Sequence, residues 1–194
     1  YCMPKKYIGN LIHLIQSIIN DKDNSNTEAF VALLDFEKAF DLVNHEFTFA
    51  AMEAFGIPYE FIRFTKLAFT NTSACCIVNG QRTNFFSLPG GGRQGDNLYP
   101  LIFCIVMQVM HIAITMQNLN GIDIKDCGIR NIKLGQYADD TTIFGTGHSD
   151  YVKLREGIQL FERASGMNVN WDKSLAPDET VTWKHPTWKS PFFF

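Results

Sequence analysis

The 194-residue sequence has no basic excess, no paired-cysteine motif and no secretion signal. Its 17 Lys and Arg and 20 Asp and Glu give a net charge of −3, whereas a freestanding nucleic-acid-binding domain usually carries a clear basic excess. A nucleic-acid role would therefore need a local basic surface or neighbouring segments. The five cysteines are odd in number and never spaced as CxxC, which argues against a zinc site and a secreted disulfide framework. We expect reduced thiols in an intracellular protein, in the nucleus or the cytoplasm.

Charge is also missing from Leu98–Met116, a run long enough to cross a bilayer. The polar residues in and just after this run recur at intervals of three and four: Gln108, His111, Thr115 and Asn118. Such spacing forms one polar stripe on a helix, and the run lacks the basic flank of a membrane span. The sequence therefore predicts a mostly buried helix and no membrane partner.

Periodicity and turn residues predict the remaining elements. The expected helices cover Tyr7–Asn20, Asn44–Phe55, Pro58–Phe69 and about Asp150–Ala164, and Gly166 ends the last one. The expected strands are a buried run ending at Asp35, a hairpin with its turn at Asn79-Gly80, and a second hairpin of Ile132–Leu134 and Thr141–Phe144. Helices and strands mix without strict alternation, which predicts an α+β fold with an antiparallel sheet and helices on one face.

Two adjacent aspartates, Asp139 and Asp140, fall between the strands of the second predicted hairpin. A tight turn is the simpler interpretation, because Asp is common in turns. However, Asp35 ends another predicted strand, and three carboxylates converge if that strand lies beside the hairpin. Such a cluster is costly unless a cation neutralises it or the pKa values rise, and carboxylate oxygens suit Mg²⁺. Spacing alone does not show that Asp35 meets the hairpin.

Four segments of the chain match known sequence motifs in their order and spacing: LLDFEKAFDLVNH (33–45), GGRQGDNLYPLIF (91–103), YADD (137–140) and FERASGMNVNWDKS (161–174). Their order and approximate spacing resemble motifs A, B, C and D of reverse transcriptases. The first, second and fourth most resemble those of non-LTR (LINE-type) retrotransposons, and MPKKYIGNLIHLIQSII is similar to the segment that precedes motif A in those proteins. YADD alone is a weak signal, but four ordered blocks over about residues 3 to 175 are highly specific.

The resemblance implies a polymerase palm, which is an α+β fold with a ferredoxin-like antiparallel sheet covered by helices on one face. Residues 1–28 would be the pre-motif-A segment, 29–175 the palm and 176–194 an irregular tail. The implied activity is RNA-directed DNA polymerisation by two-metal nucleotidyl transfer of dNTPs onto a primer 3′-OH. The implied cofactors are two Mg²⁺ ions, with Mn²⁺ as an alternative. The implied partners are an RNA template, a DNA primer, dNTPs, and the fingers and thumb of a longer polyprotein.

The resemblance also assigns the metal site. Asp35, Asp139 and Asp140 match the metal-binding triad, and the backbone carbonyl of Phe36 would also contact a metal. Phe40 matches the aromatic residue that crowds the sugar 2′ position and favours deoxynucleotides. The alternative for Phe40 is a core phenylalanine.

Further residues match with less direct support. Gln94 and Gly95 match residues that border the incoming nucleotide and the template, although a glycine run by itself indicates only a flexible turn. Arg93 is a candidate phosphate contact, and a solvated arginine is the alternative. Lys173 matches a possible proton donor to pyrophosphate, although a surface lysine is the commoner case.

Other polar residues near these motifs have simpler interpretations. Asp41 and His45 are interpreted as structural. Lys5 and Lys6 replace the usual Gly-Arg of the upstream segment and are candidate contacts for template phosphates, with a solvated charge pair as the alternative.

The sequence also departs from the family pattern. Residues 96–100 read Asp-Asn-Leu-Tyr-Pro where family members usually have Cys-Pro-Leu-Ser-Pro, and the bulk of Tyr99 calls the fit of the nucleotide pocket into question. Fingers motifs, a primer-grip block, a thumb and an endonuclease have no counterpart, so we expect an incomplete copy that starts in mid-protein. The alternative is a catalytically silent remnant that acts at most as a nucleic-acid or protein-binding module. Motifs B and D disfavour another two-metal palm enzyme such as a nucleotide cyclase.

Overall fold

The computed structural model describes residues 8–23, 29–88, 90–93, 95–124 and 129–175. The 176–194 tail, Lys5, Lys6 and Gln94 therefore lie outside the described residues. Along the chain the helices are α1 (Ile8–Asp23), α2 (Ala39–Leu42), α3 (His45–Ala54), α4 (Tyr59–Phe69), α5 (Tyr99–Thr115) and α6 (Gly147–Ser165). The strands are β1 (Phe30–Leu34), β2 (Ser73–Ala74), β3 (Ile77–Val78), β4 (Gln81–Arg82), β5 (Phe86–Ser87), β6 (Ile122–Ile124), β7 (Ile129–Ile132), β8 (Leu134–Tyr137) and β9 (Asp140–Gly145).

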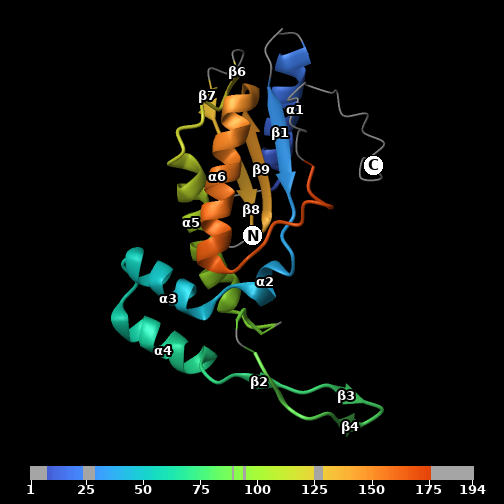
Figure 1. Ribbon diagram of the computed structural model, residues 1–194, viewed down its shortest axis with the longest axis vertical. Helices are drawn as coiled ribbons and strands as arrows, with labels where there is room; N and C mark the ends of the chain where they lie inside the picture. The colour runs from blue at the N-terminus through green and yellow to red at the C-terminus, as the bar shows by residue number, and fades with distance from the viewer. Residues whose placement is uncertain (1–7, 24–28, 89, 94, 125–128, 176–194) are drawn as a thin grey trace.

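The central sheet has the order β1-β9-β8, and both pairs are antiparallel (Figure 1). Ala32 pairs with Ile143 and Leu34 with Thr141. Because side chains alternate between the faces of a strand, this register places Ala32 and Ile143 on one face. Both belong to the main core, together with buried residues of α5 and α6.

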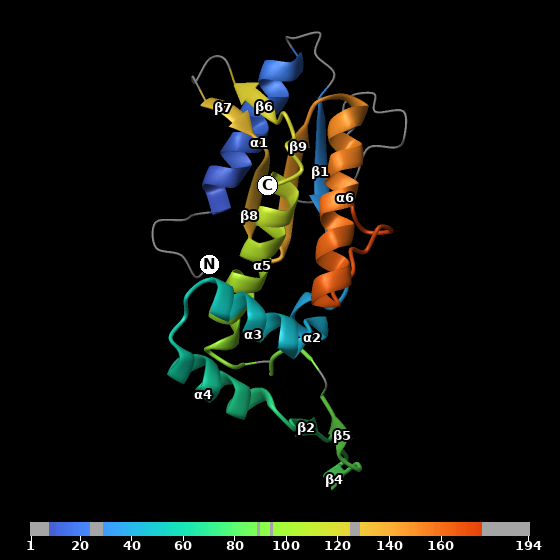
Figure 2. The same cartoon turned by 60° about the vertical axis from the view of Figure 1, so that its left-hand side comes forward.

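Helices α5 and α6 cover this face of the sheet, as Figure 2 shows. They approach closely at Gly157, where an added Cβ would lie 2.9 Å from the Cα of Ile114. The apolar run predicted to be a buried helix is α5, and its buried residues are Tyr99, Ile102, Phe103, Val106, Met107, Met110, Ala113 and Ile114. Within the described residues, no helix is both long and apolar enough to span a membrane.

The opposite face of the sheet carries a smaller cluster. Val31 and Phe144 point away from α5 and α6, and Ile18 of α1 is buried in the same cluster. The α+β class is therefore confirmed. Helices were expected on one face of the sheet alone, but α5 and α6 cover one face and α1 packs against part of the other.

Local signals explain most element ends. Asn44 caps α3, since its side chain accepts hydrogen bonds from the backbone N–H groups of Glu46 and Phe47. Gly166 ends α6 with a left-handed φ of 75°. The strand before the adjacent aspartates is β8, Leu134–Tyr137, rather than the expected 132–134, because Ile132 pairs with Ile122 in a separate ribbon.

Candidate active site

The positions of Asp35 and Asp140 follow directly from the pairing of β1 with β9. The pairing ends at Leu34 and Thr141, so Asp35 and Asp140 are the next two residues in register. Side chains alternate between the two faces of a strand. Asp35 is four residues after Val31 and Asp140 is four residues before Phe144, so both lie on the same face as Val31 and Phe144, away from α5 and α6. The sheet thus brings Asp35 beside the hairpin tip, which the spacing of the motifs could not show.

The backbone at Asp35 is held by a segment from the far end of the described chain. The Asp35 N–H donates to the Ser174 hydroxyl at 3.0 Å, and the Asp35 carbonyl accepts from the Asn170 N–H at 2.8 Å. On either side, Leu33 pairs with Leu175 and Phe36 with Val169. The segment 167–175, which contains much of the fourth motif, therefore lies along β1 and fixes the strand end that carries Asp35.

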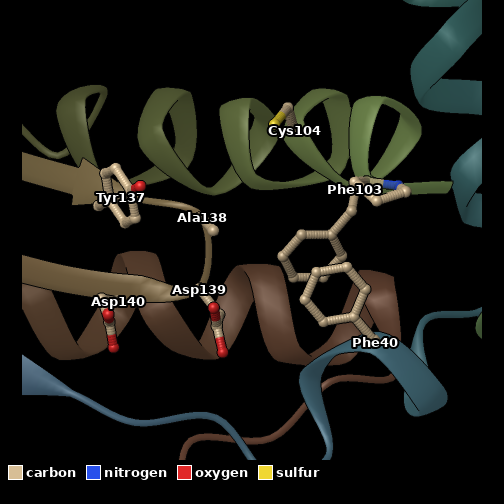
Figure 3. A pocket seen from close by; sticks show the side chains of 8 residues that line it. Phe40, Phe103, Cys104, Tyr137, Ala138, Asp139 and Asp140 are labelled. Carbon is tan, nitrogen blue, oxygen red and sulfur yellow. The ribbon is translucent and has the colours of Figure 1, made fainter. Parts of the chain in front are cut away.

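Asp139 lies in the two-residue turn between β8 and β9. Tyr137 pairs with Asp140, and Ala138 has a left-handed φ of 55°. The Thr141 hydroxyl donates to the Asp139 carbonyl at 3.3 Å and accepts from the Gln136 side chain at 3.3 Å. Figure 3 shows the carboxylates of Asp139 and Asp140 directed to the same side of this turn.

The three carboxylates affect one another electrostatically. Burial raises the pKa of Asp140, and the charges of Asp139 and Asp35 raise it further. Among the described residues, however, no three His, Cys, Asp or Glu side chains are grouped closely enough to hold one metal ion. Asp35, Asp139 and Asp140 are near enough for mutual repulsion but do not form a closed ligand set.

A pocket of about 320 Å³ opens beside the turn (Figure 3). Phe40 of the first motif and Phe103 of α5 stack in it, with ring centroids 4.4 Å apart and planes at 19°. Its lining consists of residues from the first three motifs and of Cys104, which directly follows the second motif: Phe40, Pro100, Phe103, Cys104, Tyr137, Ala138, Asp139 and Asp140. Phe40 is half-buried, so it both contacts the core and borders the pocket.

The glycine-rich loop is tied to the segment that carries Phe40. The Gly91 N–H donates to the Val43 carbonyl at 2.8 Å, and the Gly92 N–H donates to the Phe40 carbonyl at 3.0 Å. His45 donates from Nε2 to the Gly91 carbonyl at 2.7 Å. A Cβ on Gly91 would lie 2.5 Å from the Phe40 carbonyl oxygen, so this approach requires glycine. His45 thus joins the loop to the first motif.

Tyr99, which raised the question of pocket fit, does not belong to the lining of this pocket. Its side chain is buried, with 3% exposure, and its ring packs against Gly92 and near Phe69. Among the residues that the structure describes, its hydroxyl has no hydrogen-bond partner. Burial raises the pKa of this hydroxyl, and the charge of Asp41 raises it further.

Arg93, Gly95, Lys173 and Phe36 are not among the residues that line the pocket. Arg93 and Gly95 are exposed in the loop before α5. The Asp96 carboxylate accepts from the Leu98 N–H at 2.8 Å and so supports the start of α5. Lys173 is exposed on the segment that borders Asp35. Phe36 is buried against Phe161.

The chain is similar to proteins of one known family. Residues 5–183 match the family model described as reverse transcriptase (RNA-dependent DNA polymerase). The chain is 24% identical over 174 residues to the transposon TX1 149 kDa protein of Xenopus laevis. The aligned region covers 90% of this chain and 13% of that protein. It is 29% identical over 143 residues to a Pol polyprotein of the R2 element of Popillia japonica, covering 74% of this chain and 23% of that protein. The chain therefore spans less than a quarter of either relative's length.

Among solved structures, apo telomerase from Candida tropicalis, truncated from its C-terminal domain, matches with a TM-score of 0.61. The match covers 88% of this chain and 35% of that one at 14% sequence identity. At this identity the likeness shows a shared fold alone.

Proposed function

Because the chain belongs to the reverse transcriptase family and its relatives are non-LTR elements, we propose that residues 29–175 are the catalytic palm of an RNA-directed DNA polymerase. Residues 1–28 would precede motif A, and 176–194 would form a tail. The observation that supports this proposal best is the register that sets Asp35 beside Asp140 at the edge of an aromatic-walled pocket. The substrates would be dNTPs and a primer 3′-OH on an RNA template.

The pocket has two chemically different ends. Phe40 and Phe103 form an apolar wall, which suits a sugar or base, while Asp139 and Asp140 form an anionic end. The volume of about 320 Å³ lies near the lower limit for small-molecule sites, roughly 300–1,000 Å³. In this proposal the Phe40 ring excludes a 2′-hydroxyl by its bulk and so favours deoxynucleotides.

The donor set fits divalent ions in its chemistry. Asp35, Asp139 and Asp140 offer hard carboxylate oxygens. Burial raises the pKa of Asp140, and the charges of Asp139 and Asp35 raise it further, so a bound cation would relieve both effects. Mg²⁺ is usually held by one or two carboxylates together with substrate phosphates, so a closed protein ligand set is not required. These carboxylates, with the Phe36 carbonyl, would hold two ions, Mg²⁺ or Mn²⁺. When bound, the ions would activate the 3′-OH and stabilise charge on the phosphates.

The remaining roles concern positioning. Arg93 and Gly95 precede α5, and hydrogen bonds tie Gly91 and Gly92 to the segment that carries Phe40. In this proposal Gln94 and Gly95 border the nucleotide and template, and Arg93 contacts phosphate. Lys173, which lies on the segment that holds Asp35, would donate a proton to pyrophosphate.

The second candidate is a catalytically silent domain that binds nucleic acid or protein. Such a domain would need no metal ion, and the described residues contain no group of three ligands ready to hold one. The two functions predict different metal binding: a polymerase palm binds metal ions more tightly when a nucleotide is present, and a silent domain does not.

Paramagnetic resonance of Mn²⁺ with a non-hydrolysable dNTP separates these functions. The polymerase palm predicts that the dNTP strengthens Mn²⁺ binding and that Asp35→Asn and Asp140→Asn each abolish this effect. Glu156→Gln, an exposed carboxylate on α6, is the matched control and keeps it. Mn²⁺ binding that is equal in all four proteins would refute the palm assignment.

A further inference from the structure

A second surface lies away from the pocket, on the hairpin formed by β2 to β5. We call residues 73–87 the arm. Figures 1 and 2 both show it projecting beyond the helices and the central sheet. Its strands pair only in short ribbons, β2 with β5 and β3 with β4, and the turn residues Asn79 and Gly80 have φ of 51° and 80°. The arm is therefore an extended ribbon held by its own turn.

The arm exposes apolar side chains that a free ribbon would not favour. Every residue from 76 to 87 is exposed. Ile77 and Phe85 are each 67% exposed, and Phe86 is 48% exposed. An isolated two-stranded ribbon is only marginally stable in water, and a contiguous exposed apolar surface usually marks an interaction site. The arm therefore has the features of a binding element.

The charge distribution indicates the chemistry of the partner. Residues 61–95 contain four Lys and Arg and no acidic residue, so all 20 Asp and Glu lie elsewhere in the chain. The four cations are exposed: Arg63, Lys66, Arg82 and Arg93. Arg63 has an exposed ion-pair partner in Glu60, at 3.9 Å. A stretch that excludes acids in a chain of net charge −3 indicates an anionic partner.

Aromatic rings, a guanidinium and side-chain amides without carboxylates together suit one kind of anion. Bases of a single strand stack on exposed aromatic rings, and arginine contacts the phosphates. In a duplex the bases stack on one another and leave no face for Phe85. We propose that the arm binds a single-stranded polynucleotide, with Phe85 and Phe86 as stacking platforms, Arg82 as a phosphate contact, and Asn79, Gln81 and Asn84 as further hydrogen-bonding groups.

This contact is separate from the proposed polymerase site. The arm contributes no residue to the pocket that contains Asp139 and Asp140, and stacking needs no divalent ion. Binding by the arm should therefore persist in EDTA, which removes any ions from the carboxylates. The inference would survive if the polymerase proposal failed.

Fluorescence anisotropy of the whole chain with labelled RNA and DNA strands of about 15 nucleotides tests the proposal. At physiological salt in EDTA, the chain should bind both strands with a Kd on the order of 10⁻⁴ to 10⁻⁶ M and a blunt duplex more weakly. Phe85→Leu should weaken binding at least about five-fold, whereas Phe85→Tyr keeps the ring and the affinity. Phe55→Leu, at an exposed phenylalanine outside the acid-free stretch, is the matched control and should bind like the wild type.

Salt dependence tests the phosphate contact of Arg82. Arg82→Gln should reduce the slope of log K against log salt by about 0.7, the value for one phosphate on a single strand. Arg163→Gln, at an exposed arginine of α6, should leave the slope unchanged. Circular dichroism and thermal melting establish that each variant is folded, and the arm's exposure means that its substitutions leave the core intact.

Three results would overturn the proposal. One is the absence of strand binding by the wild-type chain. Another is equal affinity in Phe85→Leu and wild type. The third is concentration-dependent self-association that Phe85→Leu abolishes while strand binding persists, because the arm would then dock a second copy of the chain.

Discussion

The ring of Tyr99 fills the space that a side chain at residue 92 would need: a Cβ on Gly92 would lie 2.0 Å from the Tyr99 Cγ. The Gly92 N–H also donates to the carbonyl of Phe40. Tyr99 begins α5, and Phe40 and α5 form walls of the pocket. The contact between Gly92 and Tyr99 therefore helps to set the distance between these walls.

We predict that Gly92→Ala lowers the free energy of unfolding by about 1–3 kcal/mol, because the new methyl group overpacks against the ring. Tyr99→Ser removes the ring and should cost more, about 3–5 kcal/mol. In the double variant the methyl group has room, so the combined loss should be smaller than the sum by about 1 kcal/mol or more. Urea denaturation of the four proteins measures this coupling, and strictly additive losses would contradict the packing argument.

The carboxylates predict an effect of pH on stability in the metal-free chain. Asp140 has a raised pKa in the folded state, compared with the usual 3.8, so its ionised form destabilises the fold. Below the unfolded pKa, Asp140 is protonated in both states and the penalty vanishes. The penalty develops as the pH rises through the folded pKa and persists at neutral pH. Asp140→Asn should therefore raise the free energy of unfolding at about pH 7, with no gain at about pH 3.

Denaturation across this pH range, with Glu156→Gln as the control, checks the prediction. Without metal, Asp140→Asn should be more stable than the wild type at neutral pH. Added Mg²⁺ should make the wild type the more stable protein, because a bound ion stabilises it and Asp140→Asn has lost a ligand. An Asp140→Asn variant that is less stable than the wild type at pH 7 without metal would show that burial and repulsion do not penalise the Asp140 carboxylate.

Sequence patterns predicted the elements whose ends depend on local chemistry. Asn79-Gly80 predicted the arm's turn, since both residues adopt the positive φ that a tight hairpin favours. The side chain of Asn44 caps α3 and the left-handed Gly166 ends α6, as expected for those residue types. These signals lie within a few residues of the feature that they determine.

Contacts between distant segments could not be predicted in this way. Ser174 holds the backbone of Asp35 across 139 positions, and nothing in either segment alone indicates the pairing. Asp150 marked only the start of a helix, yet its fully buried carboxylate accepts hydrogen bonds from Asn120 and Thr146. β1 and β9 are separated by more than a hundred residues, so local patterns could not predict the approach of Asp35 to the hairpin. Only the family resemblance implied it.

In a longer protein that includes fingers and thumb, we predict that Phe40→Val weakens discrimination against ribonucleotides and spares much of the deoxynucleotide rate. The Phe40 ring stacks on Phe103 at the pocket wall, and valine would open space where a 2′-hydroxyl fits. The ratio of kcat/KM for paired dNTP and rNTP substrates measures the effect. An unchanged ratio would leave Phe40 with a packing role alone.

Finally, we predict that the 194-residue chain by itself does not extend a primer detectably. Polymerisation requires the 3′-OH to be held about 3–3.5 Å from the α-phosphate, and such positioning accounts for roughly 7–11 kcal/mol of the barrier. In the proposed function this positioning comes from fingers and thumb, and the chain spans less than a quarter of its curated relatives. Its net charge of −3 also offers little general attraction for a duplex.

The measurement is primer extension on an RNA template with Mg²⁺, comparing the chain with an Asp139→Asn variant. A strand bound by the arm alone would not change this expectation, because the arm lies apart from the pocket and places no 3′ end beside Asp139. Extension by the wild type that Asp139→Asn abolishes would contradict this prediction, and it would at the same time support the assignment of the carboxylates as the catalytic site.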